Sequence, residues 1–175
     1  MEDKKRILAV GLNSIAAAKS LFGDIKVDGV DQFPDDVRKK GYYDAVLSYM
    51  SLCVGSYRIA QKTLLKYSKV LKEGGELHLF VPSLEWAADQ ILSEEPSKIL
   101  LIHLFGEQTC GLDTYRSGFA MLDLRNLLPA VGIEVVAARA GEYTIGEYTA
   151  EMLYVSGIKK NVNSNNLNLT KSEET

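Results

Sequence analysis

The chain has 175 residues, of which 46% are hydrophobic and 25% are charged, and its formal net charge is −3. A chain of this length is the size of one domain and can bury most of its apolar surface. Its net negative charge and scattered lysines and arginines argue against a general binder of nucleic acid or anionic membranes. No apolar run reaches the roughly 18 residues of a membrane span and no signal peptide is recognisable, so we expect a cytoplasmic protein.

Metal and disulfide chemistry have little support in the sequence. Cys53 and Cys110 lie far apart without the spacing of metal ligands, and we expect both to be free thiols. His78 falls in a predicted buried strand and His103 in an apolar helix, where a histidine is more often a core residue than a ligand. We therefore predict no metal site.

The chain begins with a strand, a turn and a helix built from small and apolar residues. Residues 6–12, RILAVGL, form a short continuous apolar run, which is typical of a strand covered on both faces in a parallel sheet. Residues 14–22, SIAAAKSLF, predict a helix that Asn13 or Ser14 can cap and that Gly23 closes.

The alternation of strands and helices continues through the middle of the chain. IKVDGVD (25–31) predicts a second short strand that ends in acids, and YDAVLSYM (43–50) predicts a third. Residues 56–71 predict an amphipathic helix, and after the KEGG stop ELHLFVPS (76–83) predicts another strand. The apolar residues of that helix are Ile59, Leu64, Leu65, Tyr67 and Val70.

Three further helices and a strand pair complete the predicted domain. LEWAADQILSEE and SKILLIHLF predict two helices separated at Pro96, and FAMLDLRNLLPAVG predicts a third that Pro129 must kink or shorten. IEVVAARAGEYTIG and TAEMLYVSGIKK predict the last two strands. We expect one α/β domain over residues 1–160, doubly wound with a mostly parallel sheet, and a disordered polar tail over 161–175.

Residues 43–83 carry a recognisable family pattern. YDAVLSYMSL, followed by a helix that ends in KVLKEGGELHLFVPS, resembles the middle of the class I S-adenosylmethionine-dependent methyltransferases. In that family a strand of the form FDxVxSxxxLxH leads to a helix that ends in RVLKPGGxLxIxxP. The matching residues here are Asp44, Ser48, Leu52, Val70, Leu71, Lys72, Gly74, Gly75, Leu77 and Pro82.

The resemblance covers roughly residues 6–160 and implies the methyltransferase-like Rossmann fold. It implies that the last strand runs antiparallel between the two strands before it. Only fifteen residues separate Asp28 from Asp44, too few for a helix, a strand and two connections. We therefore expect the third strand of the family to be missing or shortened, together with the adenine-binding loop that follows it.

The first loop departs from the family pattern. The family normally has an acid and several glycines there, whereas this chain has Gly11, Leu12, Asn13 and Ser14. Leu12 places a bulky side chain where the family has a small one, and Ala9 stands where an acid is often found. Gly11 is therefore either part of a cofactor loop or an ordinary strand-to-helix turn.

The resemblance also implies where the cofactor's other contacts lie. The family's ribose-binding acid follows the second strand, and Asp28 or Asp31 could supply it, or both could be solvated strand ends. Ser48, Tyr49 and Met50 sit at the carboxyl end of a central strand, where ligands of open α/β sheets bind. The expected contacts with S-adenosylmethionine are Gly11, Asn13, Asp28, Asp31, Ser48, Tyr49 and Met50.

Two functions fit this sequence. The first is transfer of a methyl group from S-adenosylmethionine to a small-molecule acceptor, although no catalytic residue can be identified. Arg116 could hold a carboxylate or phosphate of that acceptor, or could be a surface charge. The second is a degenerate, catalytically inactive methyltransferase-fold module that acts in binding or assembly with a protein partner, which the reduced glycine loop favours.

Overall fold

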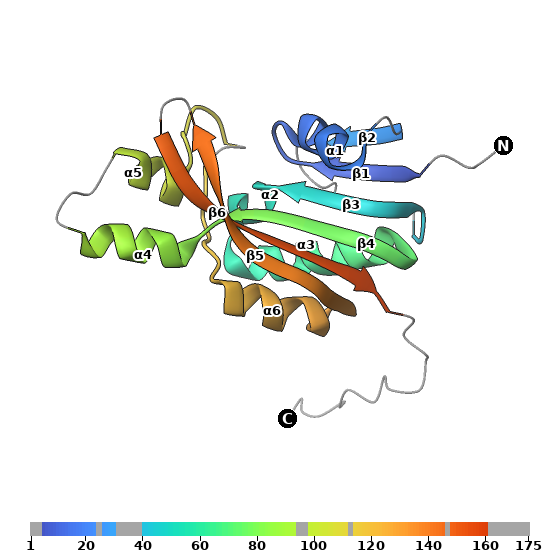
Figure 1. Ribbon diagram of the computed structural model, residues 1–175. Coiled ribbons are helices and arrows are strands. Elements are labelled where there is room, and N and C mark those ends of the chain that lie inside the picture. Colours follow the sequence, from blue (N-terminus) through green and yellow to red (C-terminus); the bar gives the residue numbers. More distant parts are fainter. Residues whose placement is uncertain are drawn as a thin grey trace, which may run out of the picture.

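One six-stranded sheet organises the protein, with strand order β2-β1-β3-β4-β6-β5. The computed structural model describes residues 5–23, 26–30, 40–93, 98–111, 114–145 and 148–160 (Figure 1). The strands are β1 (Arg6–Val10), β2 (Lys26–Val30), β3 (Tyr43–Tyr49), β4 (Leu71–Pro82), β5 (Ile133–Ile145) and β6 (Tyr148–Lys159). The helices are α1 (Ser14–Phe22), α2 (Ser51–Val54), α3 (Tyr57–Val70), α4 (Leu84–Leu92), α5 (Lys98–Phe105) and α6 (Met121–Ala130).

The sheet is mostly parallel, as the sequence predicts. Strands β2, β1, β3 and β4 pair in parallel, and β6 pairs antiparallel with both β4 and β5. The expected doubly wound sheet, with an antiparallel last strand between its two neighbours, is confirmed. The expectation that the family's third strand is missing or shortened falls on residues 31–39, which lie outside the described ranges, so it stays a prediction.

The helices cover the two faces of the sheet unequally. Figure 1 shows α3 and α6 on one face, while α1 lies on the other, over β1, β2 and β3. Because successive side chains of a strand point to opposite faces, Leu8 and Val10 enter the core beneath α3 and α6. Ile7 and Ala9 pack instead with Ala18 of α1. The central strands are therefore apolar on both faces, which explains their continuous hydrophobic runs.

Helix α3 follows the predicted amphipathic pattern only in part. Leu64, Tyr67 and Val70 are buried against the sheet. Ile59 and Leu65, which the pattern also places in the core, are 54% and 44% exposed. Apolar spacing identifies the helix but does not tell which side of its apolar stripe the sheet covers. Here Ala60, Leu64 and Tyr67 face the core, whereas Ile59 and Leu65 lie at the margins of the stripe.

The KEGG segment is the start of β4 and not only a turn. Strand β4 begins at Leu71, directly after α3, and its register against β3 shifts between the Tyr43 and Ala45 pairs. Gly74 has a φ of +74°, which allows the chain to turn within this irregular stretch. The chain thus turns at Gly74 inside the strand, and the predicted start of the strand at residue 76 was too late.

Asp44 fastens the irregular start of β4 to the neighbouring strands. Its carboxylate accepts a hydrogen bond from the Arg6 backbone amide at 2.8 Å and another from Lys72 Nζ at 2.6 Å. Burial alone would raise the pKa of Asp44, but these two partners hold it below its ordinary value. The acid that the family pattern places in this strand therefore has a structural role.

None of the helices in the described ranges has the length and apolar character to span a bilayer.

Candidate functional site

The chain order of the sheet points to one edge as the place for a ligand. From β1 the chain passes through α1 to β2 on one side, and then returns to β3 on the other side of β1. Such a reversal leaves a crevice outside the carboxyl ends of the two central strands, where ligands of open α/β sheets bind. The turn after β1 and the turn after β3 border this crevice.

These two turns lie directly against each other. Gly11 has a φ of +110°, and its backbone amide donates to the Val30 carbonyl oxygen at 2.9 Å. A Cβ atom at this position would collide with the Tyr49 carbonyl oxygen. Only glycine fits, because both the positive φ and the close approach of the β3 turn exclude a side chain. The contact between the turns therefore accounts for Gly11 even without a ligand.

Each turn also holds one non-glycine residue in the left-handed region. Asn13 has a φ of 61° and Met50 a φ of 58°, a conformation that is uncommon for residues other than glycine. The Asn13 side chain makes no capping hydrogen bond to α1. The Met50 amide donates to the Phe80 carbonyl oxygen at 2.9 Å, which ties its turn to β4. Strained turns of this kind gather at ligand sites, which makes this edge a candidate site.

Ser48 belongs to a buried hydroxyl cluster beneath this edge. Its Oγ lies 2.8 Å from Ser51 Oγ and accepts a hydrogen bond from the Tyr67 hydroxyl at 3.4 Å, while Ser51 Oγ and the Tyr67 hydroxyl are 3.1 Å apart. Burial raises the pKa of Tyr67, so this hydroxyl remains protonated. Ser48 is fully buried, and Ser51 is the half-buried member of the cluster that reaches the crevice.

Tyr49 faces the other side of the sheet from Ser48. Its ring packs at a centroid distance of 5.8 Å from Phe80, next to the α1 layer. Burial raises the pKa of its phenol, so the side chain is a neutral, half-buried aromatic wall. Ser48 and Tyr49 thus lie at one strand end but point to opposite faces of the sheet, as the alternation of a strand requires, and Met50 belongs to the turn that follows.

Asp28 lies in the middle of β2 and not at its end. It pairs in register with Leu8, whereas Val30 pairs with Val10 next to the Gly11 turn. Its carboxylate accepts a hydrogen bond of 3.1 Å from the Tyr43 hydroxyl. Burial and this hydrogen bond raise the pKa of Tyr43 to about 12. The structure therefore does not bring Asp28 to the carboxyl edge, and Asp31 lies outside the described residues.

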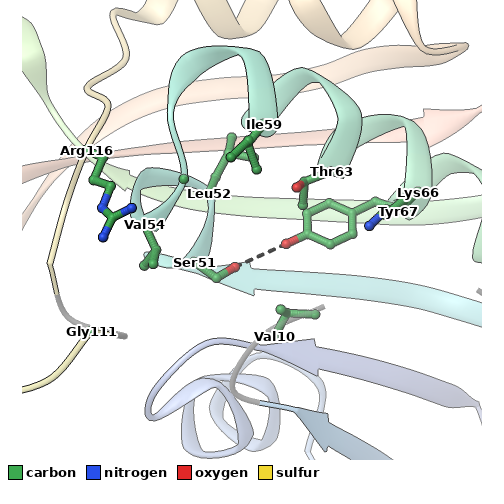
Figure 2. A pocket seen from close by; sticks show the side chains of 11 residues that line it. Val10, Ser51, Leu52, Val54, Ile59, Thr63, Lys66, Tyr67, Gly111 and Arg116 are labelled. Atoms are coloured by element: carbon green, nitrogen blue, oxygen red, sulfur yellow. Dashed lines mark hydrogen bonds between the residues drawn. The ribbon is translucent and has the colours of Figure 1, made fainter. Parts of the chain in front are cut away.

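A pocket of about 360 Å³ opens between the turn after β3, helix α3 and the segment before α6 (Figure 2). Hydroxyls from Ser51, Thr63 and Tyr67 face it, and Lys66 and Arg116 bring positive charge. This volume is in the range that accepts a small organic molecule. The remaining lining residues are Val10, Leu52, Val54, Gly55, Ile59 and Gly111.

A second hollow of about 520 Å³ lies on the α1 side of the same edge. It is bordered by the β1 turn and by the end of β2, so Gly11 and Asn13 line this hollow rather than the first. One recess therefore lies on the α3 side of the Gly11–Tyr49 contact, and the other lies on its α1 side. The other residues along the second hollow are Ser14, Ile15, Ala16, Lys19, Gly29 and Val30.

Sequence reasoning missed the α3 side of the first pocket. Ile59, Thr63 and Lys66 lie four and three residues apart, so they share one helix face, and Tyr67 follows next to them. A hydroxyl and a cation in line with an apolar residue could have marked this face as polar. The pattern alone does not tell whether such a face meets solvent or a pocket.

His103 forms a separate buried polar link beyond the edge. Its Nε2 donates to the Ser83 carbonyl oxygen at 2.7 Å, so its Nδ1 accepts a hydrogen bond from the Tyr143 hydroxyl at 3.1 Å. Burial lowers the pKa of His103, which keeps the ring neutral. The link joins α4, α5 and the β5–β6 hairpin. Nowhere in the described part of the chain do three or more His, Cys, Asp or Glu residues gather as metal ligands would.

Comparison with solved structures identifies the fold. The chain superposes on a Bacillus halodurans protein solved as a candidate methyltransferase, with a TM-score of 0.62, 13% identity and coverage of 92% of this chain and 94% of that one. A SAM-dependent methyltransferase from Methanosarcina mazei gives a TM-score of 0.61 and 14% identity, covering 91% and 94% of the two chains.

A third similar structure contains a cofactor product. It is the Burkholderia thailandensis 1,6-didemethyltoxoflavin-N1-methyltransferase with bound S-adenosylhomocysteine, at a TM-score of 0.54 and 15% identity, covering 88% of this chain and 61% of that one. No family model and no curated protein sequence matches the chain. At these identities the likeness shows the fold, and the chain therefore has the class I methyltransferase-like fold that its sequence predicts.

Proposed function

We propose that the chain binds S-adenosylmethionine at the carboxyl edge of β1 and β3 and transfers its methyl group to a small-molecule acceptor. The observation that carries this proposal is the crevice at the reversal point of the sheet, where the β1 and β3 turns each hold a non-glycine residue in the left-handed region. A similar structure with S-adenosylhomocysteine bound supports the choice of cofactor. The pocket in Figure 2 opens beside these turns and leaves room for an acceptor.

The described residues offer a set of contacts for the cofactor. Gly11 and Asn13 present the β1 turn, and Tyr49 and Met50 present the β3 turn. Asp31 is the residue directly after β2 and is the preferred carboxylate for the ribose hydroxyls, because Asp28 lies inside the strand and is bonded to Tyr43.

Methyl transfer requires little acid–base chemistry from the protein. Bound S-adenosylmethionine supplies a methyl group on a sulfonium, which is already a strong electrophile. The residues of the site hold the acceptor in line with that methyl group and exclude competing water, and positioning of this kind is a large source of rate enhancement. We assign no general base.

A binding or assembly module without catalysis is the second candidate. It is favoured by Gly11, whose identity is explained by its contact with Tyr49, and by Leu12, which is 38% exposed at a position where the family has a small residue. On this reading the fold keeps the turn geometry but the cofactor site is lost, and a protein partner is the ligand.

Calorimetric titration with S-adenosylmethionine and S-adenosylhomocysteine, with ATP and NAD as controls, separates the two candidates. Selective micromolar binding of the first two supports the methyltransferase proposal, and the Asp31→Ala variant should then lose it. Asp89→Ala is the matched control because it removes an exposed acid of α4 that lines neither recess. Absence of binding at millimolar ligand contradicts the proposal and favours the module.

A further inference from the structure

Two basic side chains line the pocket between α2, α3 and the segment before α6. Arg116 and Lys66 line it, and none of its described lining residues is acidic. The whole chain carries a net charge of −3, so this concentration of positive charge runs against the average of the molecule. A cationic recess in an acidic protein attracts anions locally.

Arg116 is held at the pocket by its own backbone. Its amide and that of Ser117 both donate to the Cys53 carbonyl oxygen, at 2.8 and 3.2 Å. The Ser117 hydroxyl donates to the Gly55 carbonyl oxygen at 2.8 Å. Three hydrogen bonds therefore fasten this segment to the end of α2, which forms one wall of the pocket. Because the Arg116 backbone is already ordered in the folded chain, ligand binding loses no further backbone entropy at this residue.

The arrangement of the side chains separates charged from apolar contacts. In Figure 2 the Arg116 guanidinium lies at one end of the pocket beside Val54, while Lys66 lies at the other end next to Tyr67. Ile59 and the Thr63 hydroxyl lie between the two ends. A ligand in this pocket meets both apolar side chains and hydroxyls along its body, and the planar Arg116 guanidinium at one end.

We propose that this pocket binds a small molecule with an apolar body and a carboxylate or phosphate group, and that the Arg116 guanidinium binds that group. The identification of this molecule as the methyl acceptor rests on the proposed function, whereas its binding does not. Arg116 is then a specificity-determining residue, since a guanidinium forms two parallel hydrogen bonds with a carboxylate or phosphate.

Matched probes test this assignment in the full-length protein without cofactor. Phenyl phosphate and 3-phenylpropanoate carry the two anionic groups, and 3-phenylpropanol is the neutral counterpart of the second. We expect both anions to bind at least about tenfold more tightly than the alcohol, because hydrogen bonds to charged groups contribute more than neutral ones. The anion that binds more tightly shows whether the pocket prefers a phosphate or a carboxylate group.

Three variants test whether Arg116 causes the preference for anions over the alcohol. Arg116→Gln should reduce the preference for the anions over the alcohol to near unity, and Arg116→Lys should retain part of it as a point charge. Arg125→Gln, which removes an exposed arginine from α6 outside the pocket, should leave it unchanged. Arg116 is exposed, so its replacement should not unfold the chain, and an unchanged melting curve confirms this.

The outcomes separate this inference from the proposed function. Equal binding of anions and alcohol, no binding of either anion at millimolar concentration, or an anion preference that survives Arg116→Gln overturns the inference. Loss of S-adenosylhomocysteine affinity in Arg116→Gln without loss of phenyl phosphate binding also overturns it, because the guanidinium would then hold the cofactor's carboxylate. Anion binding by a chain that does not bind S-adenosylhomocysteine supports the pocket and contradicts the methyl-transfer proposal.

Discussion

Two neighbouring units of the sheet keep the family pattern to very different degrees. The β3–α3–β4 unit has two central strands that are buried over most of their length, and the motif residues stand in their expected places. The β1–α1–β2 unit has a single glycine in its turn and ends in a five-residue strand whose residues are all exposed or half-buried. The chain therefore matches the methyltransferase pattern in its β3–α3–β4 unit and departs from it in the turn after β1, although β1 itself is buried.

The glycines of the two units illustrate the point. Gly74 in the first unit has positive φ, but a Cβ atom there would meet nothing within 4 Å. Gly11 in the second unit has positive φ and also carries the close contact with the Tyr49 carbonyl oxygen. The one glycine retained in the β1 turn is the one that packing demands.

Alanine at Gly11 should give the largest effect. The Gly11→Ala variant combines a disfavoured φ with a steric collision, and we expect a loss of at least about 2 kcal/mol in the free energy of unfolding. Gly74→Ala, which has only the φ penalty, should lose about 1 kcal/mol. Urea denaturation of both variants measures the difference, and equal losses would show that the contact between the two turns is not tight.

Asp44 lies in the β3–α3–β4 unit and Asp28 in the β1–α1–β2 unit, so replacing each by Asn compares how much an acid stabilises each unit. Asp44→Asn weakens hydrogen bonds from the Arg6 amide and Lys72, and we expect a loss of about 2 kcal/mol at pH 7. Asp28→Asn, which affects one hydrogen bond from Tyr43, should lose about 1 kcal/mol. A larger loss at Asp28 in denaturant titrations would reverse the ranking of the two units.

The pH dependence of Asp44 has a defined sign. Its folded-state pKa lies below the ordinary value of 3.8, so its stabilising contribution is present above pH 3.8 and disappears as the pH falls through the folded-state pKa. The difference in unfolding free energy between the wild type and Asp44→Asn should therefore shrink in acid. A difference that stays constant from pH 7 to pH 2 would contradict the ion-pair account.

His103 should make stability fall at a higher pH than Asp44 does. Burial lowers its pKa below 6.5, so the unfolded chain binds the proton more readily and stability decreases as the pH falls from 6.5 through the folded-state pKa. We expect the melting temperature to drop by about 2–4 °C per kcal/mol lost over this range. His103→Phe should flatten this part of the melting-temperature profile, and an unchanged slope would assign the effect to another group such as His78, whose pKa burial also lowers.

The hydroxyl cluster should give the smallest effect. Tyr67→Phe removes the hydroxyl shared with Ser48 and Ser51 but keeps the buried ring, and we expect a loss of about 1 kcal/mol or less. Tyr57→Phe is the control, because Tyr57 is 43% exposed and lies outside the cluster. Equal melting temperatures for the two variants would show that the cluster adds nothing to the stability of the β3 edge.

Strong periodicity let the sequence predict most of the fold. The strands β1, β3 and β4 appear as continuous apolar runs because both of their faces are buried. Helix α3 appears as apolar residues at helical spacing because only one stripe of it is buried. The prediction was weaker where burial is partial. Asp28 was expected at a strand end, but a strand of five residues leaves the position of its end open by one or two residues.

The candidate site could be predicted only in part. The carboxyl edge and the Gly11 turn follow from the order of strands and helices, because that order fixes where the sheet reverses. Ser51, Thr63 and Lys66 could not be singled out, since their role depends on how α3 is rotated and on where the segment around Arg116 returns to the sheet. Such contacts between distant parts of the chain leave no local signal in the sequence.

Amide chemical-shift mapping by NMR, with S-adenosylhomocysteine added to the labelled protein, tests the central claim most directly. If the reversal point of the sheet binds the cofactor, the amides of Gly11, Asn13, Met50 and Ser51 should shift together, and those of Gly74 and Gly132, at the opposite edge, should stay in place. No shifts at any concentration, or shifts confined to residues away from the β1 and β3 turns, would contradict the claim.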